Sequence, residues 1–317
     1  MDAFSPTFEA RIKPFEKRSK ALKPEDWDAA SKIQSDMVRT LSKEDCLMIG
    51  GARRGKVSEL ALAGLCRQVD LDSVILEKLA RLAQDEQQSD PVVWLAAGRL
   101  TGLGPRKGKV DLPDALLYRT FDAADRRLYC RAVAISGFAS LGLTEAESPR
   151  VDRWLQDANA EVRKQAIEAL THLSLEETRT WVVPRLIQGL AKTQGDALVL
   201  CANALQARQA QDALPALIRA LEELAERQAF RYDQAAPLCA VGNAIVALAK
   251  RKGPSFEQRR ESFHSGNAGG WRFVDQTEEF RANTLAILDW WRHEGRKAFM
   301  APDPNAVSPS TDTKQTR

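Results

Sequence analysis

The chain has 317 residues, of which 44% are hydrophobic and 28% are charged, a balance typical of soluble proteins. Its 46 Lys and Arg residues are nearly matched by 43 Asp and Glu residues. The net charge of +3 is too small for the broad positive surface of a dedicated nucleic-acid binder. No stretch approaches the roughly 18 apolar residues that cross a membrane, so we expect no membrane insertion.

Helix-forming residues dominate the composition, and runs of β-branched residues are few, which predicts an all-α protein. Residues 1–45 contain two helical patterns, Phe8 to Leu22 and Pro24 to Leu41, which we expect to form an N-terminal helical cap. Charges run through the first twenty residues without a continuous apolar segment. This pattern argues against a secretory signal and favours a cytoplasmic protein.

The next segment resembles a phosphate-binding loop, with Gly50, Gly55 and Lys56 at the required spacing. Such a loop also needs a preceding strand and a Ser or Thr after the lysine, whereas this sequence has Val57. We therefore expect a solvated turn between two helices. An alternative stays open, in which Arg53, Arg54 and Lys56 hold an anion or an acidic partner beside the N-terminus of the following helix.

A three-point pattern then recurs along the chain, with an apolar or small residue, a small residue four positions later, and usually a large apolar residue four positions after that. It is clearest in Asp157 to Leu173, where the apolar residues form one helical stripe and Asn159 is suited to cap the helix. The pattern occurs at Val57-Ala61-Leu65, Val92-Ala96-Leu100, Cys130-Ala134-Phe138, Val162-Ala166-Leu170, Ala197-Cys201-Leu205, Ala240-Ala244-Leu248 and Phe280-Thr284-Leu288.

The third points of this pattern lie 35, 38, 32, 35, 43 and 40 residues apart, a period typical of stacked two-helix repeats. A helix packed between two neighbours needs a small residue where backbones approach closely. The spacing therefore predicts that the middle residues Ala96, Ala134, Ala166 and Ala244 are buried. Offset prolines support this period, and we expect each in the first turn of the other helix of a pair or one turn further in, where it bends that helix: Pro113, Pro149, Pro184 and Pro215.

The segment "LQDANAEVRKQAIEAL" resembles a HEAT repeat, whose second helix carries Asp or Asn, then Val-Arg, then Ala, then Ala-Leu. The matching positions are Asn159, Val162-Arg163, Ala166 and Ala169-Leu170. The resemblance implies an α-solenoid of stacked antiparallel helix pairs over residues 46–300, with a concave face that binds macromolecules, and a bracing role for Arg163. The fold alone implies no single activity.

Three C-terminal features fall outside the regular period. Residues of about 253–275 are rich in Gly, Ser and Asn, which predicts an irregular loop. Trp290 and Trp291 are adjacent, and either cover the end of the solenoid or provide an exposed aromatic anchor for a partner. Residues 301–317 lack apolar anchors and are rich in Pro, Ser and Thr, so we expect a disordered tail.

The sequence contains no set of residues that indicates catalysis. Three dispersed histidines lack metal-ligand spacing, so we assign no catalytic residues, metal ligands or cofactor. The five cysteines contain no C-x-x-C pair, and we expect buried, reduced thiols. They are Cys46, Cys66, Cys130, Cys201 and Cys239.

The function predicted by these features is a non-catalytic scaffold or adaptor that binds another protein. An alternative is a HEAT-like nucleic-acid-binding or DNA-repair protein, in which basic turns form a stripe for phosphates. A more remote one is a protein similar to HEAT-like bilin lyases, although no chromophore site is evident. The basic turns either balance helix dipoles or form that stripe. They are Arg53-Arg54-Lys56, Arg106-Lys107-Lys109, Arg126-Arg127, Lys250-Arg251-Lys252 and Arg259-Arg260.

Overall fold

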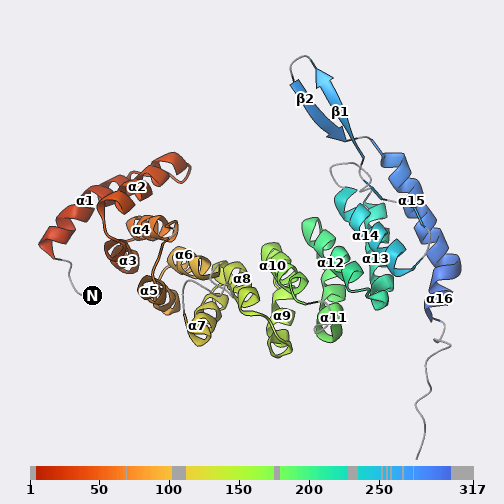
Figure 1. Cartoon of the computed structure of the whole chain (residues 1–317), viewed down its shortest axis with the longest axis horizontal. Coiled ribbons are helices and arrows are strands. Elements are labelled where there is room, and N and C mark those ends of the chain that lie inside the picture. Colours follow the sequence, from red (N-terminus) through yellow and green to blue (C-terminus); the bar gives the residue numbers. More distant parts are fainter. Residues whose placement is uncertain are drawn as a thin grey trace, which may run out of the picture. The chain divides into compact units, whose positions relative to one another are not determined.

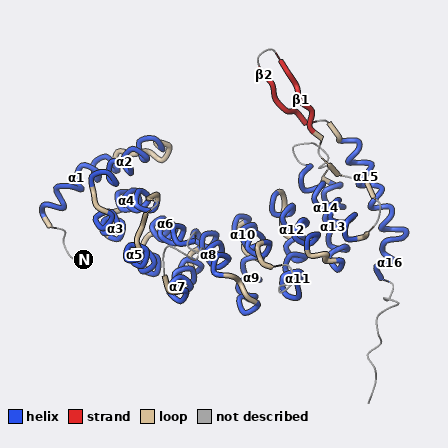
Figure 2. Tube along the Cα trace, viewed as in Figure 1, coloured by secondary structure: helices blue, strands red, loops and turns tan. Residues whose placement is uncertain are grey.

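The computed structural model describes residues 5–68, 70–101, 112–174, 179–227, 235–250, 253–254, 256–257, 259–265, 268–273 and 275–300. Within them the chain is helical except for one hairpin, as Figures 1 and 2 show. The predicted tail, 301–317, lies outside the described residues. The chain divides into two compact units, Met1–Ser174 and Leu175–Arg317, which are described separately below.

The first unit contains ten α-helices among its described residues, together with two short 3-10 helices. The α-helices are α1 Pro6–Lys20, α2 Trp27–Thr40, α3 Lys43–Gly51, α4 Lys56–Cys66, α5 Ser73–Gln84, α6 Asp90–Thr101, α7 Asp114–Asp125, α8 Arg131–Leu141, α9 Ser148–Leu155 and α10 Ala160–Thr171. The 3-10 helices are η1 Leu128–Cys130 and η2 Glu145–Glu147.

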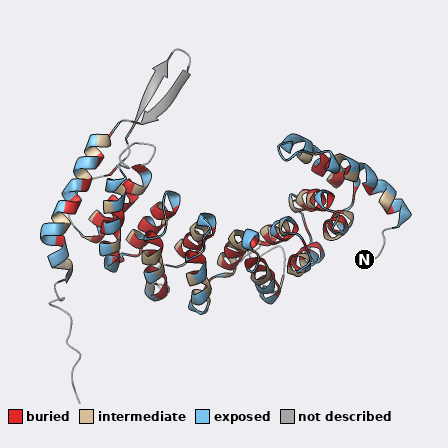
Figure 3. Cartoon of the chain, turned by 180° about the vertical axis from the view of Figure 1, so that it is seen from behind, coloured by how far each residue is buried: buried red, intermediate tan, exposed pale blue. Residues whose placement is uncertain are grey.

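Helices of the first unit pack in two rows. In one row α2 contacts α4, α4 contacts α6, α6 contacts α8 and α8 contacts α10. In the other, α3 contacts α5 and α5 contacts α7, and each of these helices also packs on the helix that follows it. The buried residues, red in Figure 3, lie on the sides of the helices that face one another. Consecutive helix pairs therefore share one continuous apolar core.

The predicted small residues lie in these helix contacts. Ala96, Ala134 and Ala166 of the first unit and Ala244 of the second are each completely buried. A glycine on α8 shows how close the approach is, because a Cβ atom at Gly137 would overlap the Phe121 ring of α7. The prediction from the three-point pattern is thus confirmed at all four alanines.

The segment before the turn to α4 is a helix, so the strand that a phosphate-binding loop requires is not found there. Residues 43–51 form α3, and residues 52–55 join it to α4. Gly55 caps α4 with φ +63°, a conformation that favours glycine. A Cβ atom at Gly50 would lie 3.2 Å from the Leu62 side chain. Both glycines of the motif therefore have structural reasons, and the predicted inter-helix turn is confirmed.

The same cap recurs in the second unit. Gly195 precedes α12 with φ +57° and ψ −134°, almost the values of Gly55, φ +63° and ψ −134°. Each glycine stands two residues before the first point of the sequence pattern, Val57 in one case and Ala197 in the other. Equivalent positions in the predicted period thus have the same backbone conformation.

The second unit contains further packed helices and the hairpin. Its helices are α11 Arg179–Leu190, α12 Asp196–Ala207, η3 Gln211–Ala213, α13 Leu214–Glu226, α14 Ala235–Leu248, α15 Thr277–Trp290, the π-helical turn η5 Trp291–Gly295 and α16 Arg296–Met300. Here α11 packs on α12, α12 and α13 on α14, and α13 on α15. Alternate helices again contact one another.

The predicted prolines take two kinds of position. Pro113 is the N-cap residue of α7, and Pro149 and Pro215 lie in the first turns of α9 and α13. A proline lacks the N–H that a first turn leaves unused. Pro184 instead lies inside α11, so it does not mark the start of that helix.

One short hairpin interrupts the otherwise helical structure, and the all-α prediction is confirmed for the described residues as a whole. Strand β1, Arg260–Ser265, pairs antiparallel with β2, Ala268–Phe273, in register from Arg260 opposite Phe273 to Ser265 opposite Ala268. The sequence between the strands is Gly266-Asn267, a residue pair typical of two-residue hairpin turns. A Gly-rich composition by itself predicts only a loop, whereas the Gly-Asn pair is the signal in the sequence that favours a hairpin.

Candidate binding site

The cationic turn predicted as an anion or partner site has its charges largely matched by carboxylates. Arg54 donates to Glu9 and to Glu16 of α1, the latter at 2.8 Å. Arg53 pairs with Asp85 at 2.9 Å, and Lys56 lies 3.9 Å from Glu59. The hydrogen bond that Arg54 donates to Glu9 raises the pKa of Arg54, and the same bond lowers the pKa of Glu9.

Arginines also connect successive inter-helix turns of the first unit. Arg53, in the turn before α4, reaches Asp85 in the turn before α6. Arg127, in the turn before α8, donates to the carbonyl oxygens of Asp85 at 3.0 Å and Gln88 at 2.6 Å. Arg131 then pairs with Asp157, in the turn before α10. These basic turns therefore brace one another, a role that accounts for much of their positive charge.

The tryptophan pair packs on its own helical segment. The rings of Trp290 and Trp291 have centroids 6.0 Å apart, and Trp291 lies 6.0 Å from Phe299. A Cβ atom at Gly295 would lie 2.8 Å from the Trp290 ring. Both tryptophans are partly exposed, so neither is a fully buried cover nor a fully exposed anchor. The anchor role stays a prediction.

A larger site lies on the first unit, between α7 and α8. This aromatic cleft has a volume of about 720 Å³, within the size range of ligand pockets. Its walls are formed by Tyr118, Phe138, Leu141 and Leu143. Three charged residues also line the cleft: Asp114, Arg119 and Glu147.

Local packing shapes the walls of the aromatic cleft. The ring centroids of Tyr118 and Phe138 lie 5.2 Å apart in an edge-to-face arrangement. The Arg150 guanidinium lies 4.4 Å from the centre of the Phe138 ring and 5.8 Å from that of Tyr118. Such cation–π contacts favour this arrangement of the rings. Tyr118 nevertheless keeps 39% of its surface exposed, so one aromatic side chain remains accessible in the cleft.

A buried carboxylate holds the arginine behind these rings. Asp125, with only 2% of its side chain exposed, accepts a hydrogen bond from Trp154 Nε1 at 2.7 Å and one from Arg150 Nη1 at 3.1 Å. Arg153 is a third donor to the same carboxylate. Arg150 also donates to Asp122 at 2.9 Å. This carboxylate cluster joins α7 to α9 and positions Arg150 against the aromatic wall.

The same cluster determines the direction in which the pKa values of Asp122 and Arg150 are shifted. Burial raises the pKa of Asp122, but hydrogen bonds from Arg150 and Arg126 outweigh that effect and bring it below its ordinary value. Burial alone would lower the pKa of Arg150, yet its carboxylate partners raise it. Both groups therefore stay charged at neutral pH, which maintains the support behind the aromatic cleft.

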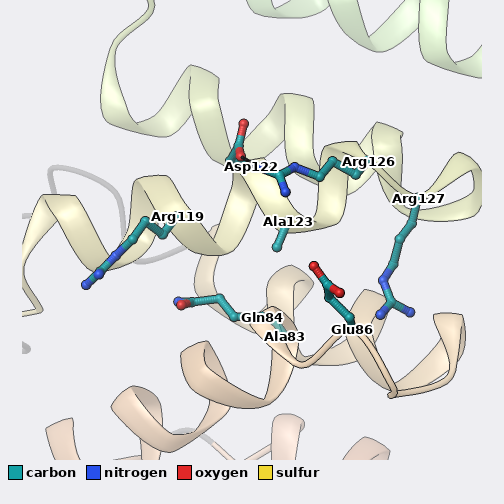
Figure 4. A pocket seen from close by; sticks show the side chains of 8 residues that line it. All are labelled: Ala83, Gln84, Glu86, Arg119, Asp122, Ala123, Arg126 and Arg127. Carbon is teal, nitrogen blue, oxygen red and sulfur yellow. Dashed lines mark hydrogen bonds and ion pairs between the residues drawn. The ribbon is translucent and has the colours of Figure 1, made fainter.

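A second, polar cleft of about 480 Å³ lies on the other side of α7, between α7 and α5. Figure 4 shows its lining side chains, of which Gln84 and Glu86 come from the segment around the end of α5. Across from them are Arg119, Asp122, Arg126 and Arg127 of α7 and its following turn. Arg126 pairs with Asp122 at 2.7 Å, and Arg127 with Asp90 at 3.2 Å. Arg119 lines both clefts.

Two carboxylates that line the aromatic cleft, those of Asp114 and Glu147, have no cationic partner among the described residues. The Asp114 carboxylate has no hydrogen-bond or ion-pair partner among the described residues, and lies in the first turn of α7. Within the described stretches, Glu147 accepts hydrogen bonds only from Thr144, through its backbone N–H at 2.9 Å and its hydroxyl at 2.5 Å. Because both donors are neutral, its charge is not cancelled. Arg119, bonded to Ala115 O at 3.3 Å, adds one positive charge.

Among the described residues, the potential metal ligands and the thiols form no organised group in either of the two clefts. Across the described stretches, no group of His, Cys, Asp and Glu is arranged to hold a metal ion. All five cysteines are free thiols, and four of them are buried. Burial raises the pKa of Cys201 to about 12, which suppresses its reactive thiolate form.

Sequence reasoning missed the aromatic cleft because its residues form no motif. Tyr118 and Phe138 are on different helices, and Leu143 lies in the segment after α8. The usable signal was Gly142, whose φ of +86° ends α8, together with the prolines near the starts of α7 and α9.

No protein-family model, curated protein or solved structure matches this sequence. Within the described part of the chain, no helix has the length and apolar character needed to cross a bilayer.

Proposed function

We propose that this protein is a non-catalytic scaffold that binds another protein, and that its helix pairs form a HEAT-like α-solenoid. The main support for this proposal is the aromatic cleft. It combines the accessible aromatic surface of Tyr118 with the unpartnered carboxylate of Asp114, and Arg150 braces its aromatic wall. Aromatic surface rimmed by polar groups is typical of protein interfaces. The period of the sequence and the buried small residues support the solenoid arrangement.

The pairing of the basic turns favours a protein partner over a nucleic acid. Phosphate binding requires cations that are available to replace counterions. Arg53, Arg127 and Arg131 contact acidic side chains or carbonyl groups of neighbouring turns. Arg259 likewise pairs with Glu279 at 2.9 Å. The predicted basic residues Arg106, Lys107, Lys109, Arg251 and Lys252 lie outside the described residues.

Affinity purification with the full chain as bait tests this proposal. A nuclease-treated extract of the producing cells is passed over the wild-type chain and over the double variant Tyr118→Ala, Asp114→Asn. We expect a protein retained by the wild type that also binds it when both are purified, and that binds the double variant at least about tenfold more weakly. The Glu86→Gln variant, altered only in the polar cleft, should bind like wild type.

The other outcomes discriminate between the functions. Retention that disappears after nuclease treatment and falls steeply with salt would support nucleic-acid binding instead. Absence of any directly binding protein would contradict the scaffold proposal. A purified partner that binds wild type and double variant equally would leave the scaffold role in place but assign it to another surface.

A further inference from the structure

We infer that the aromatic cleft binds a short partner segment in which a large apolar side chain is next to a Lys or Arg. This inference rests on the proposed protein-binding function and specifies the chemistry of the partner. The apolar side chain would contact the cleft walls, and the neighbouring cation would lie at the acidic rim formed by Asp114 and Glu147.

The walls of the cleft determine the apolar part of the partner. Tyr118 and Leu141 are accessible in the cleft and lie with the buried Phe138 and Leu143 in its walls. None of the lining residues has a buried polar side-chain atom without a partner, which a polar side chain could satisfy. The volume of about 720 Å³ accommodates one large side chain with its flanking backbone. Because Arg150 and Asp125 hold the aromatic wall in place, the partner does not need to create it.

The rim determines the charged part of the partner. Asp114 and Glu147 contribute two negative charges and Arg119 contributes one positive charge, which leaves the lining net negative. Arg150 cannot attract an anion from behind Phe138, since it is paired with Asp122 and Asp125. An unpaired carboxylate at an exposed rim favours a cation and repels phosphate or acidic side chains. A basic residue beside the apolar anchor is therefore the complementary partner.

Selection from a random peptide library displayed on phage tests this inference on the immobilised full chain. We expect the enriched peptides to share a large apolar residue next to Lys or Arg. A synthetic peptide of that consensus, labelled with a fluorophore, is then titrated with the wild type and three variants. The variants are Tyr118→Ala in the wall, Asp114→Asn at the rim and Glu86→Gln in the polar cleft.

The expected affinities differ in size and in salt dependence. Tyr118→Ala should weaken binding at least about tenfold, because truncating an aromatic anchor removes most of its contact surface. Asp114→Asn should weaken it about two- to fivefold and reduce its dependence on salt, as the loss of one exposed ion pair does. Asp114 is exposed and unpartnered, so this variant keeps the fold even if Tyr118→Ala lowers stability.

Several results would overturn the inference. These are failure to enrich any peptide, an acidic consensus, or equal affinity of the consensus peptide for wild type and both cleft variants. If the affinity purification still identifies a directly binding protein, the scaffold function stands and only the assignment to this cleft fails. If it identifies none, the proposed function itself fails.

Discussion

Arg54 and Arg150 each contact two carboxylates, but the two clusters lie in different surroundings. Arg54 joins the turn before α4 to Glu9 and Glu16 of α1, and all three side chains are between 25% and 39% exposed. Arg150 joins α9 to Asp122 and Asp125 of α7, and the Asp125 side chain is only 2% exposed. The same pairing chemistry is thus found at a solvated edge in one cluster and behind the aromatic cleft in the other.

The comparison indicates that burial, more than the number of ion pairs, determines how much an arginine contributes to stability. Water and salt screen an exposed pair, so each such pair stabilises little. Removing one partner from a buried pair leaves an uncompensated charge, which is strongly destabilising. The Arg54 turn is prominent in the sequence because its basic residues are adjacent. The Arg150 cluster is assembled from separate helices and matters more to the fold.

The largest loss of stability is expected from a substitution that breaks the buried cluster. Asp125→Ala removes the carboxylate that accepts bonds from Trp154, Arg150 and Arg153, and should lower the free energy of unfolding by about 3–5 kcal/mol. Denaturant unfolding followed by circular dichroism measures the loss. Asp122→Ala, at a more exposed position of the same cluster, is the matched control and should cost less. An equal or greater loss in that control would contradict the assigned importance of Asp125.

An intermediate loss of stability is expected from a substitution in the packing beneath the aromatic wall. Gly137→Ala places a Cβ atom in the Phe121 ring and should destabilise by about 1–3 kcal/mol through overpacking. At Gly98 of α6 an added Cβ would meet only Val133, at 3.4 Å. Gly98→Ala should therefore be neutral or gain up to about 1 kcal/mol from helix propensity. Equal stability changes in the two variants would show that α7 and α8 are less closely packed than described.

The smallest effect concerns the exposed cluster and depends on pH. Arg54 lowers the pKa of Glu9, so the stability that this pair adds is present above the ordinary pKa of 4.5 and is lost as the pH falls through the lowered value. Arg54→Gln should lower the melting temperature slightly at pH 7, and the difference from wild type should shrink below pH 4.5.

Arg81→Gln is the control for that comparison, because it removes an exposed pair with Glu77 within a single helix, α5. It should change the melting temperature less than Arg54→Gln does, since Arg54 connects two helical segments. A difference between wild type and Arg54→Gln that persists unchanged at pH 3 would show that Arg54 acts through packing instead of charge.

The helical architecture could be predicted because it follows from local patterns. The small residues at Ala96, Ala134 and Ala166 recur at a regular spacing, and each is buried where the pattern requires. The aromatic cleft could not be predicted in this way. Tyr118 and Phe138 approach only because α7 packs on α8, and Arg150 reaches them from α9. The pairing of Arg54 with Glu9 also depends on residues 45 positions apart in the chain.

The glycine caps of α4 and α12 have a consequence for the origin of the chain. Gly55 and Gly195 occupy the same place in the period, one in each unit, and share one left-handed turn geometry. If the helix pairs of the proposed α-solenoid arose by duplication, later substitution has erased most of the sequence that they shared. A glycine that no other residue replaces without strain is the kind of position that such divergence preserves. These two turns are therefore the places to look for an ancestral repeat.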